Sequence, residues 1–386
     1  MLVRTRKPGE FRLGFGLHLT LWLALAIVVA GAGYLGLSWL VGPVSLQDRF
    51  DVVKIALTVV AGIGGVVALV VAFRKQHLSE AEHVRQEDAA KREHTKLFNE
   101  RFGKAAELLS ADKPASRLAG VYAMAGLADD WVEGQQRCID VLCAYLRMPY
   151  TKPNDDSPPE AWEQRIVRHT IIRVIAVHLQ ADADPSWRGR DFDFTRVVFD
   201  GGNLAGAVFV APGRVSFQKA QFVSHFGFTN TVFDTQYASF NGASVHHGRL
   251  SFVHAKFGGH LEMMRLRVLG GMVDFIEADI GGHVHFDGST FVAGSVQFTN
   301  SRFGGELVTF NNAEFRGAEV TFAGAVFASG SVTFTAAEFA GGLVSFVGAE
   351  FAGAEVTIAP ATYDSPPKFD TFPNGLPPGL TLPSTT

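Results

Sequence analysis

Phenylalanine recurs in the second half of the chain at alternating steps of five and seven residues. The most regular stretch contains ten of them: Phe298, Phe303, Phe310, Phe315, Phe322, Phe327, Phe334, Phe339, Phe346 and Phe351. A second apolar or small residue stands two places before almost every one, mostly Ala in the five-residue steps and Val in the seven-residue steps. Side chains at i and i−2 share one face of an extended chain. The short fixed period therefore predicts a solenoid in which both positions point into one interior.

The same repeat extends towards the N-terminus, with an occasional six in place of seven and one gap of eight. It runs through Phe286, Ile280, Phe275, Val268, Met263, Phe257, Phe252, Val245, Phe240, Phe233, Phe228, Phe222, Phe217 and Phe209. Before Phe209 the step becomes a strict five, through Phe194, Phe199 and Leu204. Units such as V-F-D-G-G (198–202) and N-L-A-G-A (203–207) resemble the pentapeptide-repeat family, and the later F-x4-F-x6-F form resembles its Phe-centred variant.

This resemblance implies an all-β solenoid over 186–358, a four-sided right-handed β-helix with one short strand on each side. Four repeats would then make one coil, of about 20 residues at the start and about 24 later. A flattened two-sided coil of about 12 residues is the structural alternative. Four sides are favoured because the shortened step from Phe257 to Met263 recurs four repeats later, from Ile280 to Phe286. The family is united by shape rather than by a reaction, so the resemblance implies little about function.

Two uncharged apolar runs, 17–41 and 55–73, precede the repeats. Each is long enough to cross the hydrocarbon layer of about 30 Å as a helix, and the first is too long for a signal peptide. We therefore predict a transmembrane hairpin joined by a short extracytoplasmic loop, 42–54. Basic residues flank it on both outer sides: Arg4, Arg6, Lys7 and Arg12 in the segment 1–16, and Arg74 and Lys75 after the second run. By the positive-inside rule, both termini of this two-pass inner-membrane protein are expected in the cytoplasm.

A helical stalk, 74–110, is expected after the hairpin, because it contains no proline and only one glycine. A helical module, 111–185, should follow, with helices at 116–127, 135–146 and 159–179. We expect this module to cover the first coil at the junction 186–194, since an uncovered sheet edge invites aggregation. The motif R-F-x-K-A-x-E-L-L (101–109) and these helices resemble the region before the repeats in membrane-anchored pentapeptide-repeat proteins of actinobacteria.

The remaining segment, 359–386, is a tail that contains seven prolines. Its first part is expected to fold over the last coil and the rest to be mobile.

The composition of the 386-residue chain is that of a folded protein, with 47% hydrophobic residues and 33 phenylalanines. A net charge of −4 leaves no large basic surface, which argues against a nucleic-acid ligand. The two cysteines, Cys138 and Cys143, lie in a run with helical apolar spacing and are interpreted as core thiols.

The sequence offers little chemistry. A solenoid filled with phenylalanine leaves no room for an active site, so we expect no catalytic residue and no cofactor. One metal candidate exists: Gln236, His260, His283 and Glu306 would form an outward column, in which two imidazoles and a carboxylate could hold Zn²⁺ or Cu²⁺. The alternative is an exposed polar ladder. Thr309, Thr333 and Thr357 are expected to form a second outward column.

Three functions remain open. A non-enzymatic, membrane-anchored scaffold that presents the solenoid to a protein partner beside the lipid bilayer is favoured. Self-association through the membrane helices or the stalk is compatible with it. A mimic of duplex DNA, such as some pentapeptide-repeat proteins that target topoisomerase, would need a strongly acidic rod. Residues 194–358 instead carry 13 acidic and 9 basic residues. An enzyme or a transport component has no residue in its favour.

Overall fold

The computed structural model describes residues 24, 27–29, 31–36, 39, 46–358, 362–373 and 375–382. The chain divides into two compact units, Met1–Thr95 and Lys96–Thr386, which are described separately.

The first unit contains most of α2 (Leu46–Leu109), a helix of 64 residues. It begins inside the predicted loop 42–54, where Lys54 pairs with Asp51 one turn earlier, and no proline interrupts it. The helical stalk predicted at 74–110 is therefore confirmed as far as Leu109.

The predicted transmembrane hairpin is not found. Within the described residues, no helix combines the length and the apolar character needed to cross a membrane. Residues 1–16 and most of the first predicted span, 17–41, lie outside the described residues, and the second, 55–73, lies in α2.

The second unit begins with the end of α2 and a module of three helices, α3 (Pro114–Asp130), α4 (Gln135–Arg147) and α5 (Pro159–His178). These are the three helices expected from the sequence. Both α3 and α5 begin with proline, whose missing N–H costs nothing in the first turn of a helix. The end of α2 packs on the module through Phe98, whose ring meets that of Trp131 edge-on at 4.0 Å.

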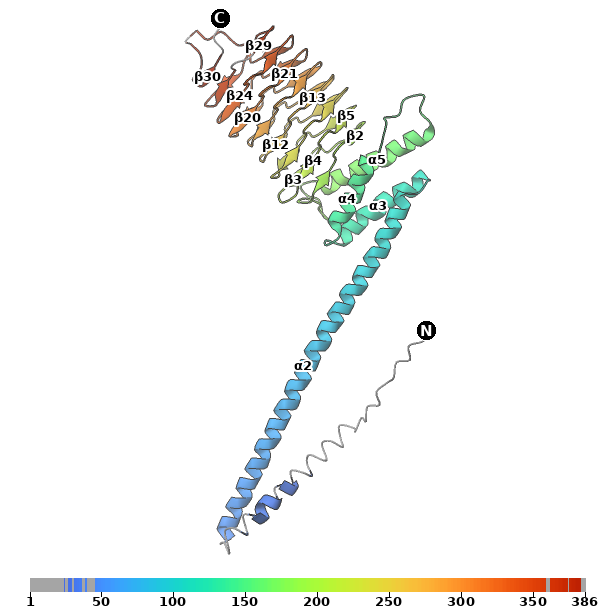
Figure 1. Cartoon of the computed structure of the whole chain (residues 1–386), viewed down its shortest axis with the longest axis vertical. Helices are drawn as coiled ribbons and strands as arrows, with labels where there is room; N and C mark the ends of the chain where they lie inside the picture. The colour runs from blue at the N-terminus through green and yellow to red at the C-terminus, as the bar shows by residue number, and fades with distance from the viewer. Residues whose placement is uncertain are drawn as a thin grey trace. The chain divides into compact units, whose positions relative to one another are not determined.

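The rest of the unit is a parallel β-solenoid of four sheets (Figure 1). Within the described residues, its nine-stranded sheet contains β1 (Phe192–Asp193), β4 (Val215–Ser216), β8 (Ala238–Ser239), β12 (Leu261–Glu262), β16 (Val284–His285), β20 (Leu307–Thr309), β24 (Ser331–Thr333), β28 (Glu355–Thr357) and β30 (Leu380–Thr381). Its eight-stranded sheet contains β2 (Val198–Phe199), β5 (Gln221–Phe222), β9 (Ser244–Val245), β13 (Arg267–Val268), β17 (Thr290–Phe291), β21 (Glu314–Phe315), β25 (Glu338–Phe339) and β29 (Thr362–Tyr363).

The other two sheets are shorter. The seven-stranded sheet contains β3 (Val208–Val210), β7 (Val232–Asp234), β11 (Lys256–Phe257), β15 (Asp279–Ile280), β19 (Arg302–Phe303), β23 (Val326–Phe327) and β27 (Glu350–Phe351), again counting described residues. The six-stranded sheet contains β6 (Phe226–Gly227), β10 (Arg249–Ser251), β14 (Met272–Asp274), β18 (Ser295–Gln297), β22 (Glu319–Thr321) and β26 (Leu343–Ser345). Each sheet pairs strands of successive coils.

The strand register confirms a four-sided coil and excludes the 12-residue alternative. Phe192 pairs with Val215, 23 residues later, and Glu314 pairs with Glu338, 24 residues later. The expectation of a shorter first coil is wrong. Its three five-residue steps are followed by the step of eight from Phe209 to Phe217, which restores the length. Neighbouring coils must match in length because each strand pairs in register with its equivalent one coil away.

The interior is a set of stacked rings. Phe310 is fully buried and lies face to face with Phe286 and Phe334, its equivalents one coil away, with ring centroids 4.7 Å apart on both sides. The regular five-residue steps turn tightly: the N–H of Ala313 donates to the carbonyl of Phe310, and Asn312 between them has φ +56°. Asparagine and glycine suit this left-handed position, which explains their frequency two places after phenylalanine.

The far end of the solenoid is built by part of the tail. Leu380 pairs with Val356, and Lys368 forms a bridge with Ser345. The ring of Phe369 stacks on that of Phe346 at 4.9 Å, so the aromatic column continues into the tail. The expectation that the tail folds over the last coil is confirmed, and the contact reaches further along it than expected, to β30.

Candidate functional site

The solenoid interior contains buried hydroxyl groups, but they serve the backbone. Ser301 Oγ donates to the carbonyl of Phe275 at 2.6 Å, and Thr231 Oγ1 donates to that of Leu204 at 2.9 Å. Ser289 does the same for Met263 at 3.0 Å. These groups satisfy carbonyls at the corners of the coil.

The predicted histidine column forms in part. The rings of His260 and His283 stack at 4.7 Å, and His283 Nε2 lies 3.2 Å from Glu306 Oε2. The register pairs Leu261 with Ala238, so Tyr237 and not Gln236 is level with His260. Among the described residues, no group of three or more His, Cys, Asp or Glu side chains is placed to share a metal ion. We interpret the column as a polar ladder.

The threonine column is present. Thr309 pairs with Thr333 and Thr333 with Thr357, and Thr381 extends the column into the tail. Its first member is not exposed as expected: Thr309 is buried, with its hydroxyl 3.1 Å from His285 Nδ1.

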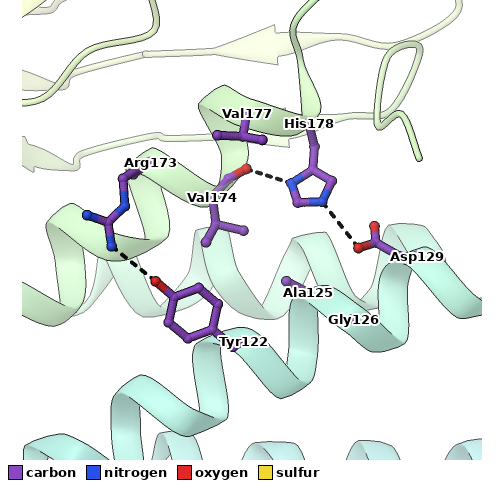
Figure 2. Close-up of a pocket in the computed structure, with 8 residues that line it drawn as sticks. All are labelled: Tyr122, Ala125, Gly126, Asp129, Arg173, Val174, Val177 and His178. Carbon is purple, nitrogen blue, oxygen red and sulfur yellow. Dashed lines mark hydrogen bonds and ion pairs between the residues drawn. The ribbon is translucent and has the colours of Figure 1, made fainter. Parts of the chain in front are cut away.

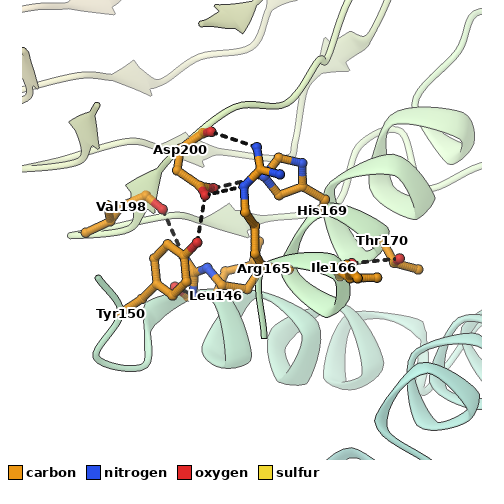
Figure 3. A network of polar contacts seen from close by, with 9 residues as sticks. Leu146, Tyr150, Arg165, Ile166, His169, Thr170, Val198 and Asp200 are labelled. Carbon is orange, nitrogen blue, oxygen red and sulfur yellow. Dashed lines mark hydrogen bonds and ion pairs between the residues drawn. The ribbon is translucent and has the colours of Figure 1, made fainter. Parts of the chain in front are cut away.

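The helical module meets the solenoid through a polar network centred on Asp200 (Figure 3). This carboxylate is 2% exposed. Its Oδ2 accepts hydrogen bonds from the hydroxyl of Tyr150 at 2.6 Å and from Nε of Arg165 at 2.7 Å, and its Oδ1 lies 2.9 Å from His169 Nε2. Burial raises the pKa of such a carboxyl group. The hydrogen bonds from His169, Tyr150 and Arg165 outweigh burial and lower the pKa of Asp200 from 3.8 to about 2.

Arg168, which also lies on α5, completes the junction between the module and the solenoid. Its side chain is 2% exposed, and it donates to the carbonyls of Leu146 at 2.7 Å and Val198 at 2.9 Å. The ring of Tyr150 lies 4.1 Å from its guanidinium carbon, a cation–π contact. Arg168 thus joins the end of α4, the helix α5 and strand β2. Together with the Asp200 network, it confirms that the module covers the first coil.

Sequence reasoning did not find this network. Asp200 lies inside the repeat unit V-F-D-G-G, and its three partners come from the linker after α4 and from α5. No spacing in the sequence links them, because the fold alone brings the segments together. His169 Nε2 lies 2.9 Å from Asp200 Oδ1, and within the described residues no hydroxyl or thiol is hydrogen-bonded to that ring. The hydrogen bonds of the network join α5 and the segment after α4 to the first coil.

A cleft of about 340 Å³ lies between α3 and α5 (Figure 2). Its lining residues are Tyr122, Ala125, Gly126, Asp129, Arg173, Val174, Val177 and His178.

At one end of the cleft, His178 is locked by three neighbours. Its Nδ1 lies 2.7 Å from the carbonyl of Val174 and its Nε2 3.2 Å from Asp129 Oδ2, while its ring stacks on that of Trp187 at 4.1 Å. Trp187 Nε1 donates to the other oxygen of Asp129 at 2.8 Å. Since both ring nitrogens are occupied, His178 is not free to act as a general base.

At the other end, Arg173 Nη2 donates to the hydroxyl of Tyr122 at 3.0 Å. Tyr122 is 53% exposed and Val177 is 57% exposed, so this part of the cleft is open to solvent. The sequence had suggested only three amphipathic helices here, and nothing in it showed that α3 and α5 would leave a groove between them.

The two cysteines, Cys138 and Cys143, are buried and free, as expected of core thiols. Burial raises the pKa of Cys138 to about 11 and that of Cys143 to about 12. Both groups are therefore protonated thiols at neutral pH and poor nucleophiles.

Comparison of the chain with models of protein families and with curated proteins found no match.

Proposed function

We propose that the protein is a non-enzymatic scaffold whose solenoid presents long, regular outer faces to a protein partner. The observation that carries this proposal is the solid interior of the solenoid. Central rings such as Phe298, Phe310 and Phe322 are fully buried and in contact from coil to coil. An interior filled by packed rings leaves the outer surface for contact with a ligand, and flat ladders of outward side chains suit an extended protein contact.

The polar groups of the module support a non-enzymatic role. His178 has both ring nitrogens engaged, and the network around Asp200 ties helices to the first coil. The thiols of Cys138 and Cys143 are buried. The polar atoms of His178 and Asp200 are thus hydrogen-bonded within the protein, without a substrate.

We further propose that the scaffold is held at a membrane by its N-terminal part, as the two uncharged runs suggest. Support comes from α2, whose exposed apolar side chains include Leu57, Val66, Leu69, Val70 and Phe73. Apolar surface of this kind is favourably removed from water by lipid. The basic residues outside both runs support a topology with both termini in the cytoplasm.

Topology is tested with reporters fused after Thr386. Green fluorescent protein at this position should fluoresce, and alkaline phosphatase should be inactive, because the first folds in the cytoplasm and the second requires export. An active phosphatase fusion would overturn the topology. Recovery of the unfused chain in the soluble fraction after cell lysis would overturn the membrane anchor itself.

The scaffold role is tested by deletion. A chain that lacks residues 1–75 should still capture the partner found by proximity labelling of the full-length protein, but lose the biological effect through mislocalisation. Residues 1–110 alone should have no effect. If they retained the full effect, the solenoid would be accessory and the proposal wrong.

The purified full-length protein also tests the alternative of a DNA mimic. Inhibition of topoisomerase supercoiling by the full-length protein at stoichiometric concentration would favour the mimic over the scaffold. We expect none, because the acidic side chains do not cover the whole solenoid: the eight-stranded sheet aligns Glu314 with Glu338, whereas two coils earlier the same column holds Arg267.

A further inference from the structure

We infer that the groove between α3 and α5 binds an amphipathic helix of a partner protein that places a carboxylate against Arg173. This surface is separate from the solenoid faces proposed above, and its test succeeds or fails independently of the deletion experiment.

The apolar character of the groove continues along α5 beyond the cleft. Trp162 and Ile166 are 40% and 55% exposed, and Val177 is 57% exposed. With Arg173, these residues are spaced by four, seven and four positions, which places them on one face of a helix. The stripe runs from Trp162 to Val177, a rise of about 22 Å at 1.5 Å per residue, which is the length of about four helical turns.

The facing helix has an unusual solvent side. An exposed helix face normally carries charged or polar residues. In α3, the exposed positions Ala115, Ala119, Tyr122 and Ala123 carry no charge, and Gly126 continues the same side into the cleft. The charged exception among the exposed positions of α3 is its last residue, Asp130, which pairs with Arg101 at 2.6 Å. Small side chains allow the backbone of a third helix to approach closely and pack between the two. A helix laid in such a groove is a common mode of peptide recognition.

Charge decides which helix fits. Arg173 lies within the apolar stripe, and its hydrogen bond in the described residues is to the hydroxyl of Tyr122. Because this hydroxyl accepts from Arg173, its own proton remains available to donate. The guanidinium and the hydroxyl thus present two donors side by side at one end of the cleft (Figure 2). A carboxylate accepts both bonds, and it would neutralise the cation that a bound apolar helix would otherwise cover.

The Asp129 end of the cleft cannot serve as a second anion site. Both oxygens of Asp129 are engaged, by Trp187 and by His178, and its negative charge disfavours another carboxylate. The groove therefore has a polarity, with an acidic residue of the partner expected near Tyr122 and apolar residues along Val177 and Ile166.

The test is a selection of helical peptides against the purified full-length chain. A displayed library of 18-residue peptides keeps an apolar stripe fixed and varies one central position over all amino acids. We expect Asp and Glu to be enriched at this position on the native protein, and Lys and Arg to replace them on Arg173→Glu. The dissociation constant of a selected Glu peptide should rise at least tenfold with Arg173→Glu, and the matching Lys peptide should restore binding.

The matched control is Arg188→Glu, which reverses an exposed arginine outside the groove and should leave peptide binding unchanged. Val177→Glu should abolish binding of all selected peptides, and circular dichroism establishes that each variant is folded. Failure to enrich any peptide, enrichment without a charge preference, or binding that survives Val177→Glu would each overturn the inference. Self-association of the chain that Arg173→Glu abolishes would also overturn it, in favour of a second copy as the occupant.

Discussion

The stacked aromatic core should be the main source of stability in the solenoid, and Phe310→Ala tests this directly. The ring of Phe310 is fully buried. It stacks on Phe286 and Phe334 at 4.7 Å with nearly parallel planes, and it meets Phe298 and Phe322 edge-on at 6.1 Å. Removal of this side chain therefore breaks contacts in its own coil and in the coils on both sides.

The expected cost can be worked from these contacts. Phe→Ala in a core costs about 3 to 5 kcal/mol, and aromatic pairs add about 0.5 to 1.5 kcal/mol beyond the buried area. The lower end applies where neighbours collapse into the cavity. Here Phe286 and Phe334 are held one coil away by the backbone ladder, which pairs Val308 with Val284 and with Val332. We therefore expect a loss of about 4 to 5 kcal/mol of unfolding free energy.

The assay is urea unfolding of the full-length chain, followed by circular dichroism. Glu319→Ala is the matched control, because Glu319 is exposed and lies in strand β22 of the same coil. It should change the unfolding free energy by less than about 0.5 kcal/mol. Thr309 is unsuitable as a control, since it is buried and bonded to His285. Similar losses for Phe310→Ala and Glu319→Ala would refute the inward register of the repeat.

Three further predictions concern the junction and the turns. Because the pKa of Asp200 is lowered to about 2, its ionised carboxylate makes its full contribution to the unfolding free energy above about pH 5, and this contribution is lost as the pH falls towards 2. Asp200→Asn should therefore remove about 2 kcal/mol of acid-dependent stability and flatten the profile measured by urea unfolding from pH 5 to 2, and an unchanged profile would contradict this. Gly282→Ala should prevent stable stacking of the coils, because the new Cβ would collide with the carbonyl oxygen of Gly259. Gly103→Ala, in a helix with open space around it, should instead raise the unfolding free energy by about 0.5 to 1 kcal/mol. A higher melting temperature for Gly282→Ala than for Gly103→Ala would contradict this prediction. Ala336→Asn should raise the melting temperature, since Ala336 has φ +55° and asparagine tolerates this conformation better; a lower melting temperature would show that the turn is not strained.

The sequence was sufficient for the solenoid because the fold is local and repeated. Each central Phe, with a small residue two places earlier, fixes the inward face of its own strand. The period favoured four sides over two, and the strand register, which pairs Glu314 with Glu338, decided between them. The length of the first coil could not be obtained this way. Three strict five-residue steps suggested a shorter coil, but pairing of Asp193 with Ser216 requires the longer step before Phe217 to complete it.

The site depended on contacts that no local pattern encodes. Asp200 appeared in the sequence as one residue of a repeat unit, and only the packing of α5 on the first coil brings Arg165 and His169 to its carboxylate. In the same way, the apolar spacing of α5 predicted a helix but not which side would remain uncovered. The repeat period is a property of neighbours along the chain, so the sequence determines it. The groove and the buried carboxylate arise where distant segments meet, and the tertiary structure alone decides which side chains share those places.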